Sequence, residues 1–210
     1  AWIKKHLSIV GLRIAEELRG HACLALEDAA PDKKNICSSK SFGVPVSTLN
    51  QMREAISEYA AVAIGKMRRQ KGAASSISVF LSTNPFLDTP QYSNAASFEF
   101  DSPTASSYGI TRMAVFLIEQ IFRCGFSYKK CGIFLNGIVP DDVIQQNLFS
   151  SPLRDEKEEK LSTVSDLINN RYGKGTIFHA SEGTDKKWAM RRQYMTPAYT
   201  TRWDQLKKVK

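Results

Sequence analysis

Residues 48–83, TLNQMREAISEYAAVAIGKMRRQKGAASSISVFLST, hold the two patterns that decide the fold. In the first part, apolar residues recur every three or four positions, which is the spacing of one helix face. In the second part, at 76–83, Ile77, Val79 and Leu81 alternate with other residues, as in a strand with one buried side. An amphipathic helix is therefore expected to lead into a strand. The shared helix face is formed by Leu49, Met52, Ile56, Tyr59, Ala63 and Met67.

Both ends of this helix carry local signals. Thr48 followed by Gln51 resembles a capping box, in which the hydroxyl accepts a bond from an unpaired backbone N–H group. The other end holds a basic cluster, which suits the negative end of a helix dipole. The cluster consists of Lys66, Arg68, Arg69 and Lys71.

The flanking segments extend the pattern to a complete domain. Strands are expected at 36–46, with a local break at Gly43 and Pro45, at 92–101 and at 127–138. A second helix is expected at 106–124, and Gly125 would end it. The buried side of this helix is expected to carry Ile110, Met113, Leu117 and Ile121.

The resulting element order is β-α-β-β-α-β, which predicts an α+β fold. In such a fold two helices usually cover one face of a four-stranded sheet. The other face would be uncovered and would carry Ser, Asn and Lys side chains. On the 92–101 strand, the alternation assigns Ala96, Phe98 and Phe100 to the core side.

The segment before this domain is predicted to be a single helix and a linker. Apolar residues at spacings of three and four over residues 1–20 indicate one helix, and Gly20 fits its end. One helix cannot bury its own apolar side, so it must pack on something else. The polar stretch 27–34 contains Pro31 and is typical of a linker. The apolar side consists of Ile3, Leu7, Val10, Ile14 and Leu18.

The chain changes character after Pro140. Residues 141–160 are polar and charged, which favours a flexible segment. A short helix is expected at 157–169, and the glycines of 173–175 would end it. A short strand is expected at 176–179, before a strongly basic end.

Charge and composition narrow the functional classes. The net charge is +8, and residues 186–210 carry eight basic side chains against one acidic side chain. Such basic clusters suit a polyanion partner, although ordinary solvated surface would look the same. No apolar run approaches the length of a membrane span, and no long apolar leader follows Ala1. The sequence starts with Ala1 and not with an initiator Met, which suggests a processed chain or part of a longer one.

The residues that usually carry catalysis or metal binding are scattered. The four cysteines form no CxxC pair, so we expect reduced thiols in a cytoplasmic protein, with no zinc site and no cofactor. No phosphate-binding loop, nucleophile elbow or zinc-protease helix is present. Asp141 and Asp142 are adjacent, but two-metal chemistry needs carboxylates on a rigid scaffold, and this pair lies in a polar segment.

Candidate phosphate contacts lie on the first and last strands. Residues 38–41, SSKS, and residues 128–130, YKK, combine small hydroxyls with lysines, which suits contact with a DNA backbone without base reading. An ordinary exposed sheet face is the alternative. A stand-alone nucleic-acid-binding module of RNA-recognition-like topology is a second alternative. It would need aromatic residues on the central strands to stack bases, and Phe98 and Phe100 are assigned to the core.

A short motif follows the domain. Residues 145–149, QQNLF, place two large apolar side chains next to each other in a polar segment. Such a segment can order on a partner by inserting both side chains into a groove. The alternative is a latch that packs back on the domain.

These segments resemble the C-terminal half of the UmuC family, the catalytic subunits of bacterial DNA polymerase V, which are Y-family translesion polymerases. Residues 39–43, SKSFG, look like the start of the family's little-finger domain. Residues 145–149 are similar to its sliding-clamp-binding pentapeptide. Residues 188–203, from Trp188 to Trp203, resemble its C-terminal signature, which plasmid- and mobile-element-borne relatives share.

The resemblance implies a division of the chain. Residues 1–20 would be the last thumb helix, 21–35 a linker, and 36–140 the little finger, which grips DNA. Residues 141–160 would be a flexible segment with the clamp motif, and 161–210 the UmuC-type C-terminal region. The implied DNA-binding residues are Ser39, Lys40, Ser41, Lys129 and Lys130. The implied clamp-binding residues are Gln145, Leu148 and Phe149.

The same resemblance implies partners and a missing activity. The C-terminal region would contact the UmuD′ dimer or the RecA filament in the SOS response. The metal-binding palm has no counterpart in the chain, so the chain alone should not polymerise. Mg²⁺ would belong only to a full-length polymerase.

Overall fold

A computed structural model describes residues 2–25, 31–142, 156–191 and 194–207, and its contacts divide the chain into residues 1–32 and 33–210. The helices are α1 (Trp2–Leu18), α2 (Leu49–Arg69), α3 (Ser107–Ile121) and α4 (Glu156–Tyr172), with short 3-10 turns at Ala180–Glu182 and Trp203–Gln205. The strands are β1 (Ile36–Val46), β2 (Gly72–Thr83), β3 (Ser93–Thr104) and β4 (Tyr128–Pro140). No described helix is both long and apolar enough to cross a membrane.

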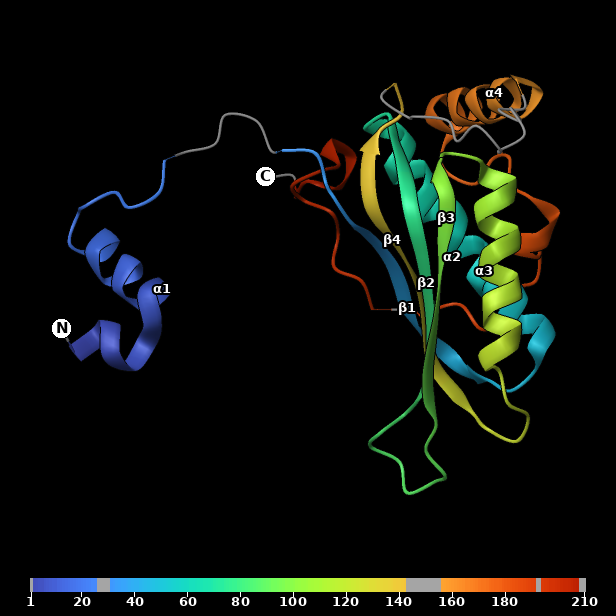
Figure 1. The fold of residues 1–210 in the computed structure, drawn as a ribbon, viewed down its shortest axis with the longest axis horizontal. Coiled ribbons are helices and arrows are strands. Elements are labelled where there is room, and N and C mark those ends of the chain that lie inside the picture. Colours follow the sequence, from blue (N-terminus) through green and yellow to red (C-terminus); the bar gives the residue numbers. More distant parts are fainter. Residues whose placement is uncertain (1, 26–30, 143–155, 192–193, 208–210) are drawn as a thin grey trace. The chain divides into compact units, whose positions relative to one another are not determined.

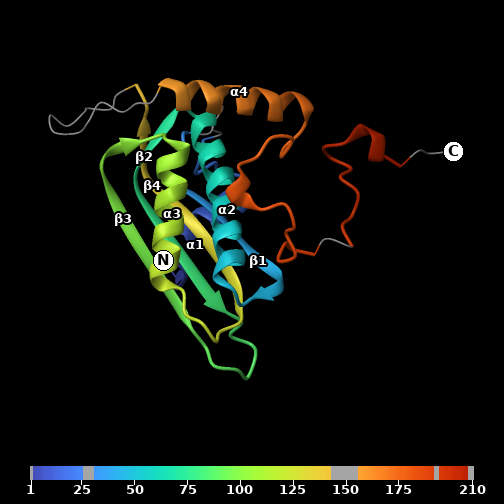
Figure 2. The same ribbon diagram turned by 90° about the vertical axis from the view of Figure 1, so that its right-hand side faces the viewer.

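The four strands form one antiparallel sheet in the order β1-β4-β2-β3. Each helical crossover skips one strand, so that β4 lies between β1 and β2, and β2 lies between β4 and β3. Helices α2 and α3 run side by side over the same face (Figures 1 and 2). The predicted α+β fold, with two helices on one side of a four-stranded sheet, is confirmed.

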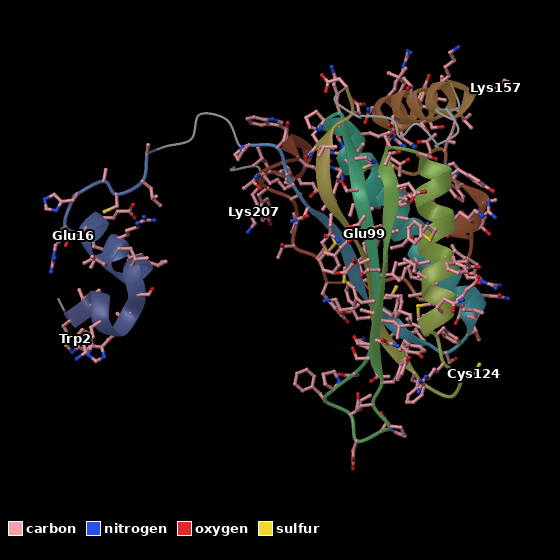
Figure 3. All side chains as sticks on the ribbon, in the orientation of Figure 1. Trp2, Glu16, Glu99, Cys124, Lys157 and Lys207 are labelled. Atoms are coloured by element: carbon pink, nitrogen blue, oxygen red, sulfur yellow. The ribbon has the colours of Figure 1, made fainter. Side chains whose placement is uncertain are left out.

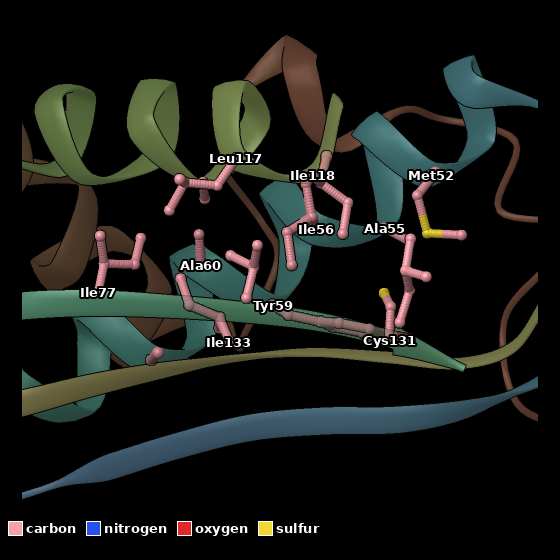
Figure 4. Packing of buried hydrophobic residues seen from close by; sticks show 14 of the residues in the cluster. Met52, Ala55, Ile56, Tyr59, Ala60, Ile77, Leu117, Ile118, Cys131 and Ile133 are labelled. Atoms are coloured by element: carbon pink, nitrogen blue, oxygen red, sulfur yellow. The ribbon is translucent and has the colours of Figure 1, made fainter. Parts of the chain in front are cut away.

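The core lies between this face and the two helices. Ile77, Val79 and Leu81 of β2 are fully buried, as their alternation predicted. Side chains of α2 and α3 point down to the sheet, where Ile133 and Cys131 of β4 meet them (Figure 4). The side of α2 that the sequence assigned to the core is buried from Met52 to Met67. Burial of each large aliphatic side chain contributes about 1.5–3 kcal/mol, so this layer supplies most of the cohesion.

Local chemistry determines where the two covering helices begin. The Thr48 hydroxyl accepts a hydrogen bond from the backbone N–H of Gln51 at 3.4 Å. At α3, the Ser106 hydroxyl accepts a bond from the backbone N–H of Gly109 at 2.9 Å. Each cap satisfies a donor that the first helical turn leaves unpaired.

Helix α4 lies across the ends of α2 and α3 (Figure 2). Arg68, near the end of α2, donates two hydrogen bonds of 2.8 Å to the carboxylate of Asp166 on α4. The same guanidinium donates to the hydroxyl of Ser107, the first residue of α3. The helix predicted at 157–169 is therefore confirmed, and one arginine joins it to both covering helices.

The strand expected at 176–179 is wrong. The side chain of Asn169 accepts a bond from the backbone N–H of Ile177 at 3.0 Å and donates to its carbonyl oxygen at 2.9 Å. Because a side chain satisfies these backbone groups, no strand partner is needed. Gly173 and Gly175 both have positive φ and turn the chain away from α4, as expected for helix-ending glycines.

Residues 1–32 form their own unit. The continuous helix expected for residues 1–20 is broken at Leu7 and Ser8, where Ser8 has φ 61°. This kink divides the predicted apolar stripe, and Val10 and Leu18 are exposed. The end of the helix agrees with the prediction: Gly20 has φ 90°, and the N–H of His21 bonds to the carbonyl of Glu16 at 3.0 Å.

Candidate nucleic-acid interface

The sheet face opposite α2 and α3 carries short polar side chains in register across all four strands. We call it the serine face. One row runs Ser41–Lys130–Ser82–Ser93, and the next runs Ser39–Gly132–Phe80–Ala95. The following rows contain Cys37, Phe134, Ser78 and Ser97, and then Asn136, Ser76 and Glu99. Successive strand residues point to opposite faces of a sheet. Since Ile77, Val79 and Leu81 of β2 point into the core, the residues between them must lie on the serine face.

Hydroxyl and amide groups on this face bond to one another. The Ser97 hydroxyl donates to the Ser78 oxygen at 2.9 Å, and the Asn136 amide donates to the same oxygen at 3.2 Å. Within the fifteen residues of the serine face, Lys130 and Glu99 are the charged side chains. The face is thus polar but close to electrically neutral.

Three of the five predicted DNA-contact residues share this face. Ser39, Ser41 and Lys130 lie on adjacent strands, with Ser41 directly paired to Lys130. Lys129 lies elsewhere and donates a hydrogen bond of 2.7 Å to the carbonyl oxygen of Phe42. The five predicted DNA-contact residues therefore do not all lie on one face of the sheet, because neighbouring strand residues point to opposite faces.

Lys40 faces the helix side instead, between Ser39 and Ser41. Its ammonium lies 3.2 Å from a carboxylate oxygen of Glu58 on α2 and 5.5 Å from the ring centroid of Tyr59. Lys186 contacts the other carboxylate oxygen of Glu58 at 2.9 Å. Burial alone would raise the pKa of Glu58, but hydrogen bonds and charges from Lys186 and Lys40 hold it below its usual value. Lys40 is thus paired within the fold, although the two lysines and the one carboxylate together keep one net positive charge.

A C-terminal segment, residues 178–191, packs on α2 and β1; we call it the strap. Trp188 is 2% exposed and meets Phe42 and Tyr59 edge to face, at centroid distances of 6.0 and 5.9 Å. Its indole N–H donates to Glu54 at 3.4 Å. By their contacts, the sheet and the strap belong to the same compact unit, residues 33–210.

Backbone contacts hold the strap as well. The N–H of Gly43 donates to the carbonyl of Trp188 at 3.0 Å, at the break that the sequence predicted in β1. A side chain at Gly43 would collide with the carbonyl oxygen of Ala189, so the close approach requires glycine. At the start of the strap, buried Glu182 accepts a bond from the N–H of His179 at 3.0 Å, and burial raises its pKa.

Two aromatic residues of the serine face were not identified as site residues. Phe80 and Phe134 lie on the central strands β2 and β4, with ring centroids 5.6 Å apart. The signal was present, since Phe80 stands between buried Val79 and Leu81, and Phe134 stands between buried Ile133 and Leu135. Phe98 does share the face of buried Ile77, as predicted, but the argument from Phe98 and Phe100 did not consider Phe80 and Phe134.

The cysteines and carboxylates form no metal-binding cluster among the described residues. Cys131 is buried in the core, and burial raises the pKa of its thiol. Cys124 lies just beyond the end of α3 and is exposed (Figure 3). Asp141 and Asp142 directly follow β4. The clamp-motif residues Gln145, Leu148 and Phe149 lie outside the described residues.

The geometry defines a class: an α+β domain of split β-α-β units that carries two helices on one face of its sheet and mostly small polar side chains on the other. Residues 33–148 match the model of the impB/mucB/samB family C-terminal domain. The chain belongs to this family. Residues 159–209 match a second model, described as a domain of unknown function (DUF4113), which includes the strap.

Relatives match almost the whole chain. The chain is 40% identical over 209 residues to protein UmuC of Salmonella typhimurium, covering 99% of the chain and 50% of that protein. It is 39% identical over 203 residues to SamB of Salmonella typhimurium, covering 96% and 48%, and 38% identical over 202 residues to MucB of Escherichia coli, covering 96% and 47%. The chain thus spans about half the length of these relatives and fits the C-terminal half of UmuC-type proteins.

Among solved structures, a Y-family DNA polymerase chimera of Dbh and Dpo4 is similar at a TM-score of 0.39 and 15% identity. The match covers 64% of this chain and 36% of the chimera. A likeness at this level does not bear on the assignment.

Proposed function

We propose that the chain is the DNA-holding and partner-docking part of an error-prone translesion DNA polymerase. The observation that carries the proposal is membership of the impB/mucB/samB family over residues 33–148. The serine face supports it, because hydroxyls and one lysine suit contact with a phosphate backbone without base reading. Ser39, Ser41 and Lys130 are the contact residues on this face.

The electrostatic part of the proposal is modest. Lys40 and Lys129 are engaged within the fold, so Lys130 is the cation that the serine face offers. Each phosphate that a protein neutralises adds a slope of about −0.9 to the dependence of log affinity on log salt for duplex DNA. Replacing Lys130 with Ala should therefore weaken binding about equally for all sequences and reduce the slope by roughly one.

Fluorescence anisotropy with labelled duplexes of two unrelated sequences over a series of salt concentrations tests the proposal. Lys66→Ala is the matched control, because Lys66 is exposed on α2, on the other side of the sheet. Binding that is independent of salt, or that strongly prefers one sequence, would refute the proposed grip. So would equal effects of the two variants.

Recruitment is a separate part of the proposal. Leu148 and Phe149 would anchor a sliding clamp, with Gln145 as a polar contact. A double variant with Ala at Leu148 and Phe149 should lose clamp binding in a pull-down and keep its melting temperature. A lowered melting temperature would instead support a latch that packs on the domain.

The remaining partners and the chemistry are assigned to the whole protein. The UmuD′ dimer and the RecA filament are proposed partners of residues 161–210. The polymerase reaction and its Mg²⁺ are proposed for a palm outside this chain. A primer-extension assay with the 210-residue chain should show no nucleotide incorporation, and measurable incorporation would refute this assignment.

A further inference from the structure

We propose that Phe80 and Phe134 form a stacking platform for unpaired bases of single-stranded DNA. The platform rests on the proposed function, since it lies on the face that would hold DNA, but it assigns a different ligand to the centre of that face. Duplex contact needs cations and hydroxyls, whereas this centre consists of two aromatic rings.

The rings lie in the middle of the sheet and next to each other. Phe80 belongs to β2 and Phe134 to β4, the two inner strands. Their ring planes are inclined by 37° at a centroid distance of 5.6 Å. Phe134 is 38% exposed, although Ile133 and Leu135 beside it are fully buried on the other face. The core thus closes without these rings.

Gly132 explains how one ring can lie low on the sheet. It pairs directly with Phe80, and a Cβ at this position would come within 2.7 Å of the Phe80 ring. Only the absence of a side chain at Gly132 leaves this room. The ring therefore lies over the backbone of β4, with its far side directed away from the core.

Polar groups around the rings match the rest of a nucleotide. The ammonium of Lys130 lies over the Phe80 ring, 5.7 Å from its centroid. A cation there can pair with a phosphate while the adjacent base stacks on the ring. Two serines lie beside the rings on the same face: Ser39 pairs with Gly132, and Ser78 pairs with Phe134.

Single-stranded DNA fits this arrangement better than a duplex. In a duplex, each base is stacked on its neighbours, so its faces are closed to a protein ring. An unpaired base exposes both faces, and stacking on an aromatic side chain tolerates any base. A near-neutral face with two aromatic rings thus suits bases more than a dense row of phosphates.

The test uses the 210-residue chain and three fluorescent probes of equal length: oligo-dT, an abasic strand with the same phosphates, and a duplex. The wild type should bind oligo-dT at least about fivefold more tightly than the abasic strand. Phe134→Ala should remove this difference and leave duplex affinity unchanged. Phe134→Leu, which keeps an apolar side chain, should also remove most of it.

Two exposed phenylalanines serve as controls. Phe98 has the same exposed fraction as Phe134 but lies on the opposite face, and Phe86 is 93% exposed between β2 and β3. Ala at either position should leave the preference for oligo-dT intact. Equal affinity of the wild type for oligo-dT and the abasic strand would overturn the platform alone. A wild type that binds none of the three probes would overturn the proposed DNA grip as well.

Discussion

The strap provides a stability test whose size follows from the structure. Trp188 is 2% exposed and packs against Phe42 and Tyr59. A buried Trp covers about 150–250 Å², which at about 25 cal/mol per Å² corresponds to roughly 4–6 kcal/mol. Measured Trp-to-Ala changes in cores give about 3–5 kcal/mol. Trp188→Ala should therefore remove about 3–5 kcal/mol from the free energy of unfolding.

Urea unfolding of the wild type and the variant, followed by circular dichroism, measures this difference. Domains of this size have total stabilities of about 5–15 kcal/mol, so such a loss is easily resolved. Trp203→Ala is the matched control, because Trp203 lies in the same C-terminal region and is 89% exposed. It should change the stability by less than about 0.5 kcal/mol. A loss below about 1 kcal/mol for Trp188→Ala would show that the strap is not packed on α2 and β1.

Two further predictions concern ion pairs. The pKa of Glu58 is lower in the folded protein than its unfolded value, which is near 4.5. The charged carboxylate therefore stabilises the fold at pH values above the unfolded pKa. This stabilisation is lost as the pH falls through the lower, folded pKa. The wild type should therefore lose more unfolding free energy than Glu58→Gln between about pH 5 and pH 3, and parallel urea curves would contradict this. Arg68→Ala should release α4, seen as faster hydrogen exchange in residues 160–172, because the two bonds to Asp166 are lost. Arg69→Ala is the control, because it removes a neighbouring exposed side chain and should leave hydrogen exchange unchanged. Unchanged exchange in both variants would show that Arg68 does not hold α4 in place.

Periodicity in the sequence predicted the main helices and strands, because an element that is buried on one side has apolar residues at regular spacing. The alternation at Ile77, Val79 and Leu81 and the helix face from Met52 to Met67 agree with the buried set. The kink at Ser8 and the irregular backbone at Ile177 left no such pattern in the sequence. The first depends on one residue with positive φ, and the second on a side chain eight positions away.

The candidate site was only partly predictable for a related reason. Alternation could separate Lys40 from Ser39 and Ser41, and it could place Phe80 away from the core. It could not show that Lys40 meets Glu58, because that contact brings together a strand and a helix. Nor could it show that Lys186, far along the chain, shares the same carboxylate.

The sequence by itself determined the β-α-β-β-α-β order, the helix cap at Thr48 and the family resemblance, because these depend on residues close together in the chain. Tertiary structure alone decided the strand order β1-β4-β2-β3, which makes β2 and β4 the central strands. It also decided that Trp188 belongs to the core. Such facts depend on which distant segments bury each other's apolar surface, and no local pattern records that choice.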